Sequence, residues 1–188
     1  RDREDTGRRT EQLMFGERGL VHIYTGDGKG KTTSALGLAM RALGHGARVI
    51  MIQFMKGWDS YGELKTALKL EGLEIIQTGR PDYVYKGSEL PEDYEEAERG
   101  MEKAREVIDK GCCDMLILDE INVAIDHGLV SAGSVAELAK NRPFGMELVL
   151  TGRGMHRELI AIADLVTEMR EIKHPYKDGV LARKGVEF

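Results

Sequence analysis

The segment GDGKGKTT at residues 26–33 constrains the fold more than any other part of the chain. It follows the apolar run LVHIYT (20–25) and opens KTTSALGLAMRAL (31–43), in which apolar residues recur at helical spacing. A glycine-rich turn between a strand and a helix lets backbone N–H groups face phosphate oxygens, and the helix dipole adds positive charge. The segment therefore predicts a phosphate-binding loop, the alternative being a merely flexible glycine loop.

The spacing of this loop is unusual. The common pattern G-x-x-x-x-G-K-[ST] would place its first glycine at position 25, where this chain has Thr25, so the loop begins one residue late at Gly26. Lys31 can reach phosphate oxygens as a point charge, and the Thr32 hydroxyl suits a magnesium ion. Spacing alone leaves open whether a triphosphate is held in the ordinary way.

Strand and helix patterns alternate along the rest of the chain. We expect strands at 20–25, 47–54, 73–78, 114–119, 146–151 and, in LVTEMREI, at 165–172, with helices at 31–43, 62–72, 91–110, 131–141 and 156–164. Repeated β-α-β units predict a three-layer α/β fold of the P-loop NTPase (RecA-like) type, with a mostly parallel sheet of about six strands. Residues 1–18 are expected to form a mobile arm, and residues 19–188 a single domain.

Parallel sheets bind ligands beyond the carboxyl ends of their strands, which here means just after residues 25, 54, 78, 119 and 151. Asp119 and Glu120 follow the fourth strand, where carboxylates are placed to hold magnesium, although they could instead cap the next helix. Arg153, together with His156 and Arg157, follows the fifth strand and could neutralise phosphate charge. No arrangement typical of a protein nucleophile is apparent.

Composition excludes several other classes of protein. The 188 residues suffice for one domain with a full core, and a net charge of −5 argues against general binding of nucleic acids or anionic membranes. No apolar run approaches the ~18–20 residues that span a bilayer, and no signal-peptide pattern is seen, so we expect a cytoplasmic protein. Cys112 and Cys113 are adjacent, which favours buried thiols over a disulfide.

The motifs together resemble a known enzyme family. The segments YTGDGKGKTTSALGLAMRALGHG, VIMIQFMKG, GELK, LILDEIN, LTGRGMHRELIAIADLVTEM and KHPYKDGVLARKGVEF look like those of the ATP:cob(I)alamin adenosyltransferases of the CobA type. The likeness covers residues ~19–188, with the motifs in the same order. The short loop combined with LTGRGMHR is far more specific to this family than a phosphate-loop motif alone, which many enzymes share.

The resemblance implies a reaction at carbon rather than at phosphorus. Members of this family transfer the 5′-deoxyadenosyl group of ATP to the Co(I) of a reduced corrinoid, either cobalamin or a precursor, and release triphosphate, in adenosylcobalamin biosynthesis or salvage. Their shortened loop holds ATP in the reversed direction, with the γ-phosphate lying where other P-loop proteins place an inner phosphate. The resemblance also implies Mg²⁺, a reductase that supplies Co(I), and a homodimer in which the N-terminal arm covers the corrinoid of the other subunit.

The residues expected to carry this chemistry follow from the matching motifs. Lys31, Thr32 and Glu120 are expected to be catalytic, and Thr32, Glu120 and Asp119 to hold the metal. Substrate binding is expected from the loop and from the end of the fifth strand, through Gly26, Asp27, Gly28, Lys29, Gly30, Lys31, Thr32, Thr33 and Arg153.

One segment departs from the family pattern. Family members often carry a Phe/Trp pair after TG at the end of the third strand, where it packs beneath the corrinoid, whereas this chain reads TGRPDYVYKG. Tyr83 and Tyr85 are the candidate substitutes, and the alternative is that they are two ordinary loop tyrosines. Two other functions stay open: a generic P-loop ATPase or kinase, and a non-catalytic nucleotide- or corrinoid-binding module.

Overall fold

The computed structural model describes residues 14–16 and 18–188. Its centre is a sheet of six strands in the order β3-β2-β4-β5-β1-β6, and every neighbouring pair is parallel. The strands are β1 (Val21–Thr25), β2 (Val49–Phe54), β3 (Leu73–Thr78), β4 (Met115–Asp119), β5 (Glu147–Thr151) and β6 (Leu165–Glu168). The expected parallel sheet of about six strands is therefore confirmed.

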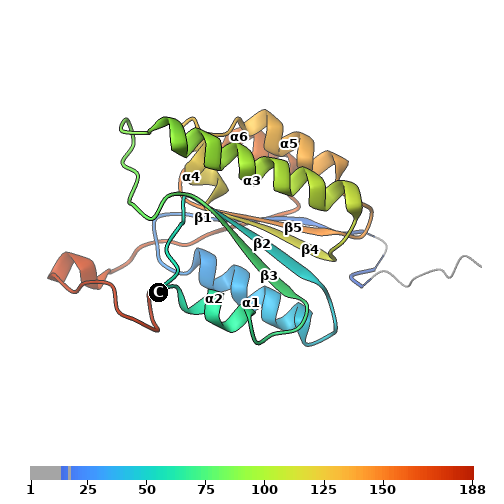
Figure 1. Cartoon of the computed structure of the whole chain (residues 1–188), viewed down its shortest axis with the longest axis horizontal. Helices are drawn as coiled ribbons and strands as arrows, with labels where there is room; N and C mark the ends of the chain where they lie inside the picture. The colour runs from blue at the N-terminus through green and yellow to red at the C-terminus, as the bar shows by residue number, and fades with distance from the viewer. Residues whose placement is uncertain (1–13, 17) are drawn as a thin grey trace, which may run out of the picture.

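Helices cover both faces of the sheet, as Figure 1 shows. On one face lie α1 (Lys31–Leu43) and α2 (Gly62–Ala67). On the other lie α3 (Pro91–Lys110), α4 (Ile121–Asp126), α5 (Ala132–Asn141) and α6 (Arg157–Ile162), and the short 3-10 helix η1 (Pro175–Asp178) follows β6. These are the three layers that the alternating pattern predicts.

The core lies on both sides of the two most apolar strands. Every residue of β2 and β4 is buried, as expected for continuously apolar strands of a parallel sheet. One hydrophobic cluster joins the sheet to α3, α5 and α6, and a second joins it to α1. Cys113 is buried, and this burial raises the pKa of its thiol to about 12, whereas Cys112 is half-buried, so the prediction of two buried thiols is confirmed for Cys113 alone.

The longest helix begins and ends where the sequence predicts. Pro91 stands at the first helical position of α3, and the Asp93 carboxylate accepts a hydrogen bond from the Leu90 N–H at 2.7 Å. Gly111 ends the helix in the left-handed conformation at φ 55°.

Some predicted boundaries were wrong. The helix expected at 62–72 ends at Ala67, because residues 68–72 form turns, in which Leu68 is 90% exposed and so gains no packing that would extend the helix. The last strand ends at Glu168 rather than at 172, since the Met169 carbonyl turns to accept a bond from Gly28 N–H. The short α4, directly after β4, was not predicted at all.

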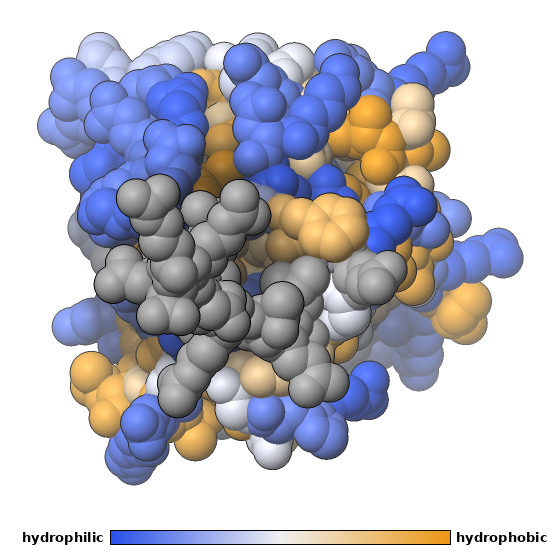
Figure 2. Space-filling view, turned by 90° about the vertical axis from the view of Figure 1, so that its right-hand side faces the viewer, coloured by the Kyte–Doolittle hydropathy of each residue, from blue (hydrophilic) through white to orange (hydrophobic). Residues whose placement is uncertain are grey.

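The strand ends place the candidate site. The carboxyl ends of the strands lie on the left in Figure 1, and the segment that follows β6 passes along the same end. Figure 2 shows the opposite end, whose visible surface is mainly hydrophilic with hydrophobic areas between. Among the described residues, no helix is long and apolar enough to cross a membrane.

Most of the expected N-terminal arm, residues 1–13 and 17, lies outside the described residues. Of the rest, Phe15 packs against the cluster beneath α1, and the Arg18 guanidinium forms an ion pair with Asp164 at 2.7 Å.

Candidate active site

The glycine-rich loop is fixed by close backbone contact with the segment after β6. A Cβ on Gly26 or Gly28 would lie 2.4 or 2.7 Å from the Met169 carbonyl oxygen, so only glycine fits at either position. The Gly28 N–H donates to that same oxygen at 2.7 Å. The Lys31 ammonium donates to the carbonyls of Gly26 and Gly28 at 2.7 and 2.8 Å. The predicted loop, strand and helix thus come together as expected.

The first turn of α1 is joined to the end of β4 through a buried carboxylate. Asp119 is fully buried, and its Oδ1 accepts hydrogen bonds from the hydroxyls of Thr32 at 2.8 Å and Thr151 at 2.7 Å. Strand β5 lies between β4 and β1 in the sheet, and Thr151 at its end bonds to the end of β4. Because the Thr32 hydroxyl donates its single proton to Asp119, its lone pairs remain available for a cation.

A lysine that the sequence analysis did not single out completes the shell of Asp119. Lys56 Nζ lies 2.7 Å from Asp119 Oδ2, and Gln53 Nε2 donates to the same oxygen at 3.4 Å. Burial opposes the charged form of Lys56, but the charges of Asp119 and Glu120 outweigh it and raise the pKa of the ammonium.

Glu120 stands between β4 and α4 in the left-handed conformation, at φ 60°. Its N–H donates to Thr151 Oγ1 at 2.9 Å, which holds this strained backbone. Burial and the neighbouring charge of Asp119 raise the pKa of the Glu120 carboxyl. Within the part of the chain that the structure describes, no hydrogen bond or ion pair engages this carboxylate, so it can accept a cation.

The cations expected at the site differ in their surroundings. Burial lowers the pKa of Lys31, against the opposing charge of Glu120. Arg153 reaches the loop, where its Nη2 donates to the Asp27 carbonyl at 3.4 Å. His156 instead caps α6, accepting a bond from the Glu158 N–H.

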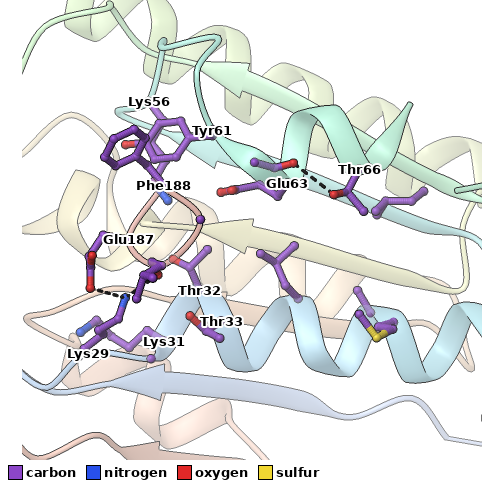
Figure 3. Close-up of a pocket in the computed structure, with 18 of the residues that line it drawn as sticks. Lys29, Lys31, Thr32, Thr33, Lys56, Tyr61, Glu63, Thr66, Glu187 and Phe188 are labelled. Carbon is purple, nitrogen blue, oxygen red and sulfur yellow. Dashed lines mark hydrogen bonds and ion pairs between the residues drawn. The ribbon is translucent and has the colours of Figure 1, made fainter. Parts of the chain in front are cut away.

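Two cavities meet at these residues. The first, of about 650 Å³, extends from the loop along α1 and α2, with Lys29, Gly30, Lys31, Thr32 and Thr33 at its polar end. In Figure 3, Lys29, Lys31 and Thr32 lie on one side of this pocket, and Lys56, Tyr61 and Phe188 lie on the other. Gly26, Asp27 and Gly28 form the back of the loop and do not line it.

The second cavity, of about 440 Å³, lies beside the segment after β3. Trp58, Tyr83 and Val84 supply apolar surface, and Arg153 lies in its polar wall. Tyr83 and Tyr85 contact each other edge to face, with ring centroids 4.8 Å apart, but only Tyr83 lines the cavity. The two cavities share four lining residues: Lys31, Lys56, Tyr61 and Glu120.

The segment 79–90 that carries the two tyrosines is braced against α3 and α4. The Arg80 guanidinium pairs with Asp93 at 2.8 Å, and Glu89 pairs with His127 Nδ1 at 2.8 Å in a nearly buried contact. The Trp58 N–H donates to the Pro81 carbonyl at 2.5 Å. These contacts hold the edge of the second cavity in place.

The segment after β6 also covers the glycine-rich loop. Lys29 Nζ donates to the Val186 carbonyl at 3.1 Å and lies 3.9 Å from Glu187. The Arg183 guanidinium pairs with the Glu187 carboxylate at 3.1 Å, and the backbone N–H of Arg183 donates a hydrogen bond to the same carboxylate. Together these two contacts lower the pKa of the Glu187 carboxyl to about 2. The C-terminal segment KHPYKDGVLARKGVEF, one of the segments that carry the family resemblance, therefore lines part of the first cavity.

Lys56, Trp58 and Tyr61 were the residues that sequence reasoning missed. The signal was present, because they follow the second strand within MKGWDSYG, and the end of that strand at residue 54 was one of the five expected ligand positions. Among the described residues there is no group of three or more His, Cys, Asp or Glu side chains that could hold a metal by itself.

Comparison with solved structures agrees with the fold. A KaiC-like protein of Pyrococcus horikoshii OT3 superposes with a TM-score of 0.56 at 15% identity, and the match covers 85% of this chain and 76% of that one. At this identity the likeness supports the P-loop NTPase-like fold alone.

Comparison with known sequences is more specific. A corrinoid adenosyltransferase of Sinorhizobium sp. is 38% identical over 175 residues, which are 92% of this chain and 81% of that protein. Corrinoid adenosyltransferases of Pseudomonas aeruginosa and Escherichia coli K12 are 36% and 33% identical, each over 92% of this chain and over 85% and 87% of their own lengths. The family model described as "ATP:corrinoid adenosyltransferase BtuR/CobO/CobP" matches residues 17–188. The expected resemblance is confirmed, and the chain belongs to the ATP:corrinoid adenosyltransferase family.

Proposed function

We propose that this chain transfers the 5′-deoxyadenosyl group of ATP to the Co(I) of a reduced corrinoid and releases triphosphate. The observation that carries the proposal is the pair of cavities with a common wall of Lys31, Lys56, Tyr61 and Glu120. One cavity begins at the glycine-rich loop, and the other is bordered by aromatic residues. Such a pair suits an enzyme that brings two substrates together at one point.

The chemistry requires no nucleophile or base from the protein. The cobalt of the substrate supplies both electrons of the new cobalt–carbon bond, the bond from the 5′-carbon to oxygen breaks, and its electron pair leaves on the triphosphate. The protein's task is therefore to orient the two substrates, to exclude water and to stabilise the charge on the leaving group. Lys31, the loop N–H groups and the Thr32 hydroxyl are placed for the last of these.

The oxygen donors at the site fit a magnesium ion. Thr32 has free lone pairs, and the Glu120 carboxylate is unengaged within the described residues, so these two would be direct ligands beside phosphate oxygens and water. Asp119 already accepts bonds at both oxygens and would act by orienting Thr32. Bound Mg²⁺ would neutralise charge on the departing triphosphate.

The second cavity is proposed to receive the corrinoid. Tyr83 and Trp58 would contact the apolar face of the ring, and Arg153 would lie at the edge nearest the loop. Tyr85 would act by supporting Tyr83 through their edge-to-face contact. If adenosylation of cobalamin is unchanged when both tyrosines are replaced by alanine, this assignment is wrong.

The finer physiological assignments are part of the same proposal. We place the enzyme in the cytoplasm, as a homodimer, with a separate reductase that supplies Co(I). Support comes from the family to which the chain belongs and, for the compartment, from a sequence without an apolar spanning run.

Incubation of the protein with MgATP and chemically reduced cobalamin tests the proposed function. We expect the absorbance of cob(I)alamin to disappear while an equal amount of triphosphate accumulates. Formation of ADP or phosphate with the cobalamin unchanged would instead favour the generic ATPase or kinase. Binding of both compounds without any product would favour a non-catalytic binding module.

A further inference from the structure

Lys56 occupies a position that the proposed reaction would use. It lies in the wall shared by the two cavities, together with Lys31 and Glu120. If one cavity holds ATP and the other the corrinoid, the 5′-carbon must stand where they meet. The oxygen that leaves this carbon then lies at the same junction, beside the Lys56 ammonium.

The backbone that carries Lys56 is held in an unusual conformation. Met55, directly before it, is left-handed at φ 56°, although it is not glycine. Directly after it, Gly57 packs so closely on the segment after β3 that a Cβ would lie 2.2 Å from the Gly79 carbonyl oxygen. A Cβ on Gly79 would lie 2.4 Å from the Lys56 nitrogen. Strain of this kind, held by the surrounding structure, is typical of functional sites.

The side chain of Lys56 is fixed as firmly as its backbone. Its ammonium lies 2.7 Å from the fully buried Asp119 carboxylate and 5.3 Å from the centre of the Tyr61 ring, and the side chain is 13% exposed. An ammonium has three N–H donors, and Asp119 takes only one of them. The remaining donors can bind an anion that enters the junction. Figure 3 shows Lys56 beside Tyr61, across the pocket from Lys31.

We infer that Lys56 is a further catalytic residue, whose ammonium binds the oxygen of the triphosphate that becomes charged when the bond to the 5′-carbon breaks. The ammonium keeps its proton throughout and stabilises the new negative charge by a charge-assisted hydrogen bond. Lys31 binds the triphosphate at the loop, and Asp119 with Tyr61 positions Lys56 at the opposite end. This inference rests on the proposed function.

The inference predicts a difference between two ligands that a general phosphate contact would not produce. The oxygen in question is uncharged in ATP, where it bridges phosphorus and carbon, and charged in free triphosphate. Lys56→Gln should therefore weaken binding of inorganic tripolyphosphate by about 10-fold or more, in the range for a lost charge-assisted bond, and ATP binding by less than about 3-fold. Titration calorimetry with each ligand, without corrinoid, measures both.

Matched variants separate this role from a structural one. Lys56→Arg, which keeps the charge, should retain most of the tripolyphosphate affinity, and Lys65→Gln, in an exposed position of α2 outside both cavities, should change neither affinity. Equal weakening of both ligands by Lys56→Gln, or no weakening of either, would overturn the inference.

A second comparison covers the case in which Lys56→Gln does not fold because Asp119 is left without its partner. Asp119→Asn frees Lys56 and should keep or increase tripolyphosphate binding in the absence of Mg²⁺. Adding Lys56→Met removes both charges of the pair and should lower that binding by about 10-fold or more. If the single and the double variants bind tripolyphosphate equally, the inference is wrong. Adenosyl transfer by the unaltered protein is measured separately, so failure of the proposed function is recognised independently.

Discussion

Single residues at the site act through short chains of hydrogen bonds. Thr32 donates to Asp119, Asp119 also accepts from Thr151, and Thr151 in turn accepts from the Glu120 N–H. Each hydroxyl therefore has a defined direction, because a hydroxyl has only one proton to donate. The Thr32 hydroxyl, one of the expected magnesium ligands, is therefore oriented by the protein itself, and such preorganisation favours stabilisation of a departing anion.

At this scale we predict the effect of removing one hydroxyl. Thr32→Ala deletes both the proposed metal ligand and a bond to buried Asp119, so adenosyl transfer should fall by about 100-fold or more. Ser34→Ala, on the same helix but lining neither cavity, is the control and should leave the rate unchanged. The initial rate of loss of cob(I)alamin absorbance measures both. An unaltered rate in Thr32→Ala would contradict the proposed role.

At the scale of elements, α3 packs closely on the sheet at Gly100. A Cβ on Gly100 would lie 2.6 Å from Phe54 Cε1 and 2.7 Å from Thr78 Oγ1, at the ends of β2 and β3. These strand ends carry Lys56 and the tyrosine segment. The close approach of α3 is therefore one of the contacts that positions the wall of the second cavity.

Gly100→Ala should consequently destabilise the protein by about 1–3 kcal/mol, because the methyl group has no space. Gly37→Ala provides the matched control, since that position is exposed in α1 and a Cβ there would meet nothing within 4 Å. The control should stabilise by up to about 1 kcal/mol through helix propensity. Urea denaturation gives the free energy of unfolding of each variant. Equal values for the two would show that α3 is not close-packed here.

The loop between β3 and α3 should contribute a pH-dependent stability. The Arg80 guanidinium, beside Asp93, holds the pKa of that carboxyl below its usual range. A lowered folded-state pKa means that the stabilisation is complete above the unfolded pKa of about 3.9 and is lost as the pH falls through the folded value. Arg80→Met should therefore reduce stability most at neutral pH, and its difference from the unaltered protein should shrink below pH 4. Urea denaturation of both proteins, from neutral pH to below pH 4, measures this difference in the free energy of unfolding. A difference independent of pH would mean that the guanidinium acts by packing alone.

At the scale of the whole molecule, the glycine-rich loop connects distant parts of the chain. Gly26 and Gly28 rest on Met169 after β6, Thr32 is bonded to the end of β4, and Lys29 contacts the segment that contains Glu187. A ligand in the loop should therefore stabilise the fold as one cooperative unit rather than locally.

Inorganic tripolyphosphate with Mg²⁺ should raise the melting temperature. At 100 times its dissociation constant it would contribute about 2.7 kcal/mol, which corresponds to a shift of roughly 5–10 °C for a chain of this size. Lys31→Met should abolish most of the shift, and Lys140→Met, on α5 away from both cavities, should preserve it. Calorimetric melting curves measure the shifts. A shift that survives in Lys31→Met would place the anion elsewhere.

The sequence by itself determined the sheet, the place of the glycine-rich loop between β1 and α1, and the family. The continuous apolar run MLIL (115–118) favours a buried parallel strand, and Gly26, Gly28 and Gly30 allow the chain to turn tightly, so both features are encoded locally. Only the tertiary structure decided which side chains share a wall. Lys56 meets Asp119 because β2 and β4 are neighbours in the sheet, and Tyr83 lines a cavity while Tyr85 does not because distant contacts orient their loop. Such positions depend on pairings between residues far apart in the chain, and no local pattern specifies them.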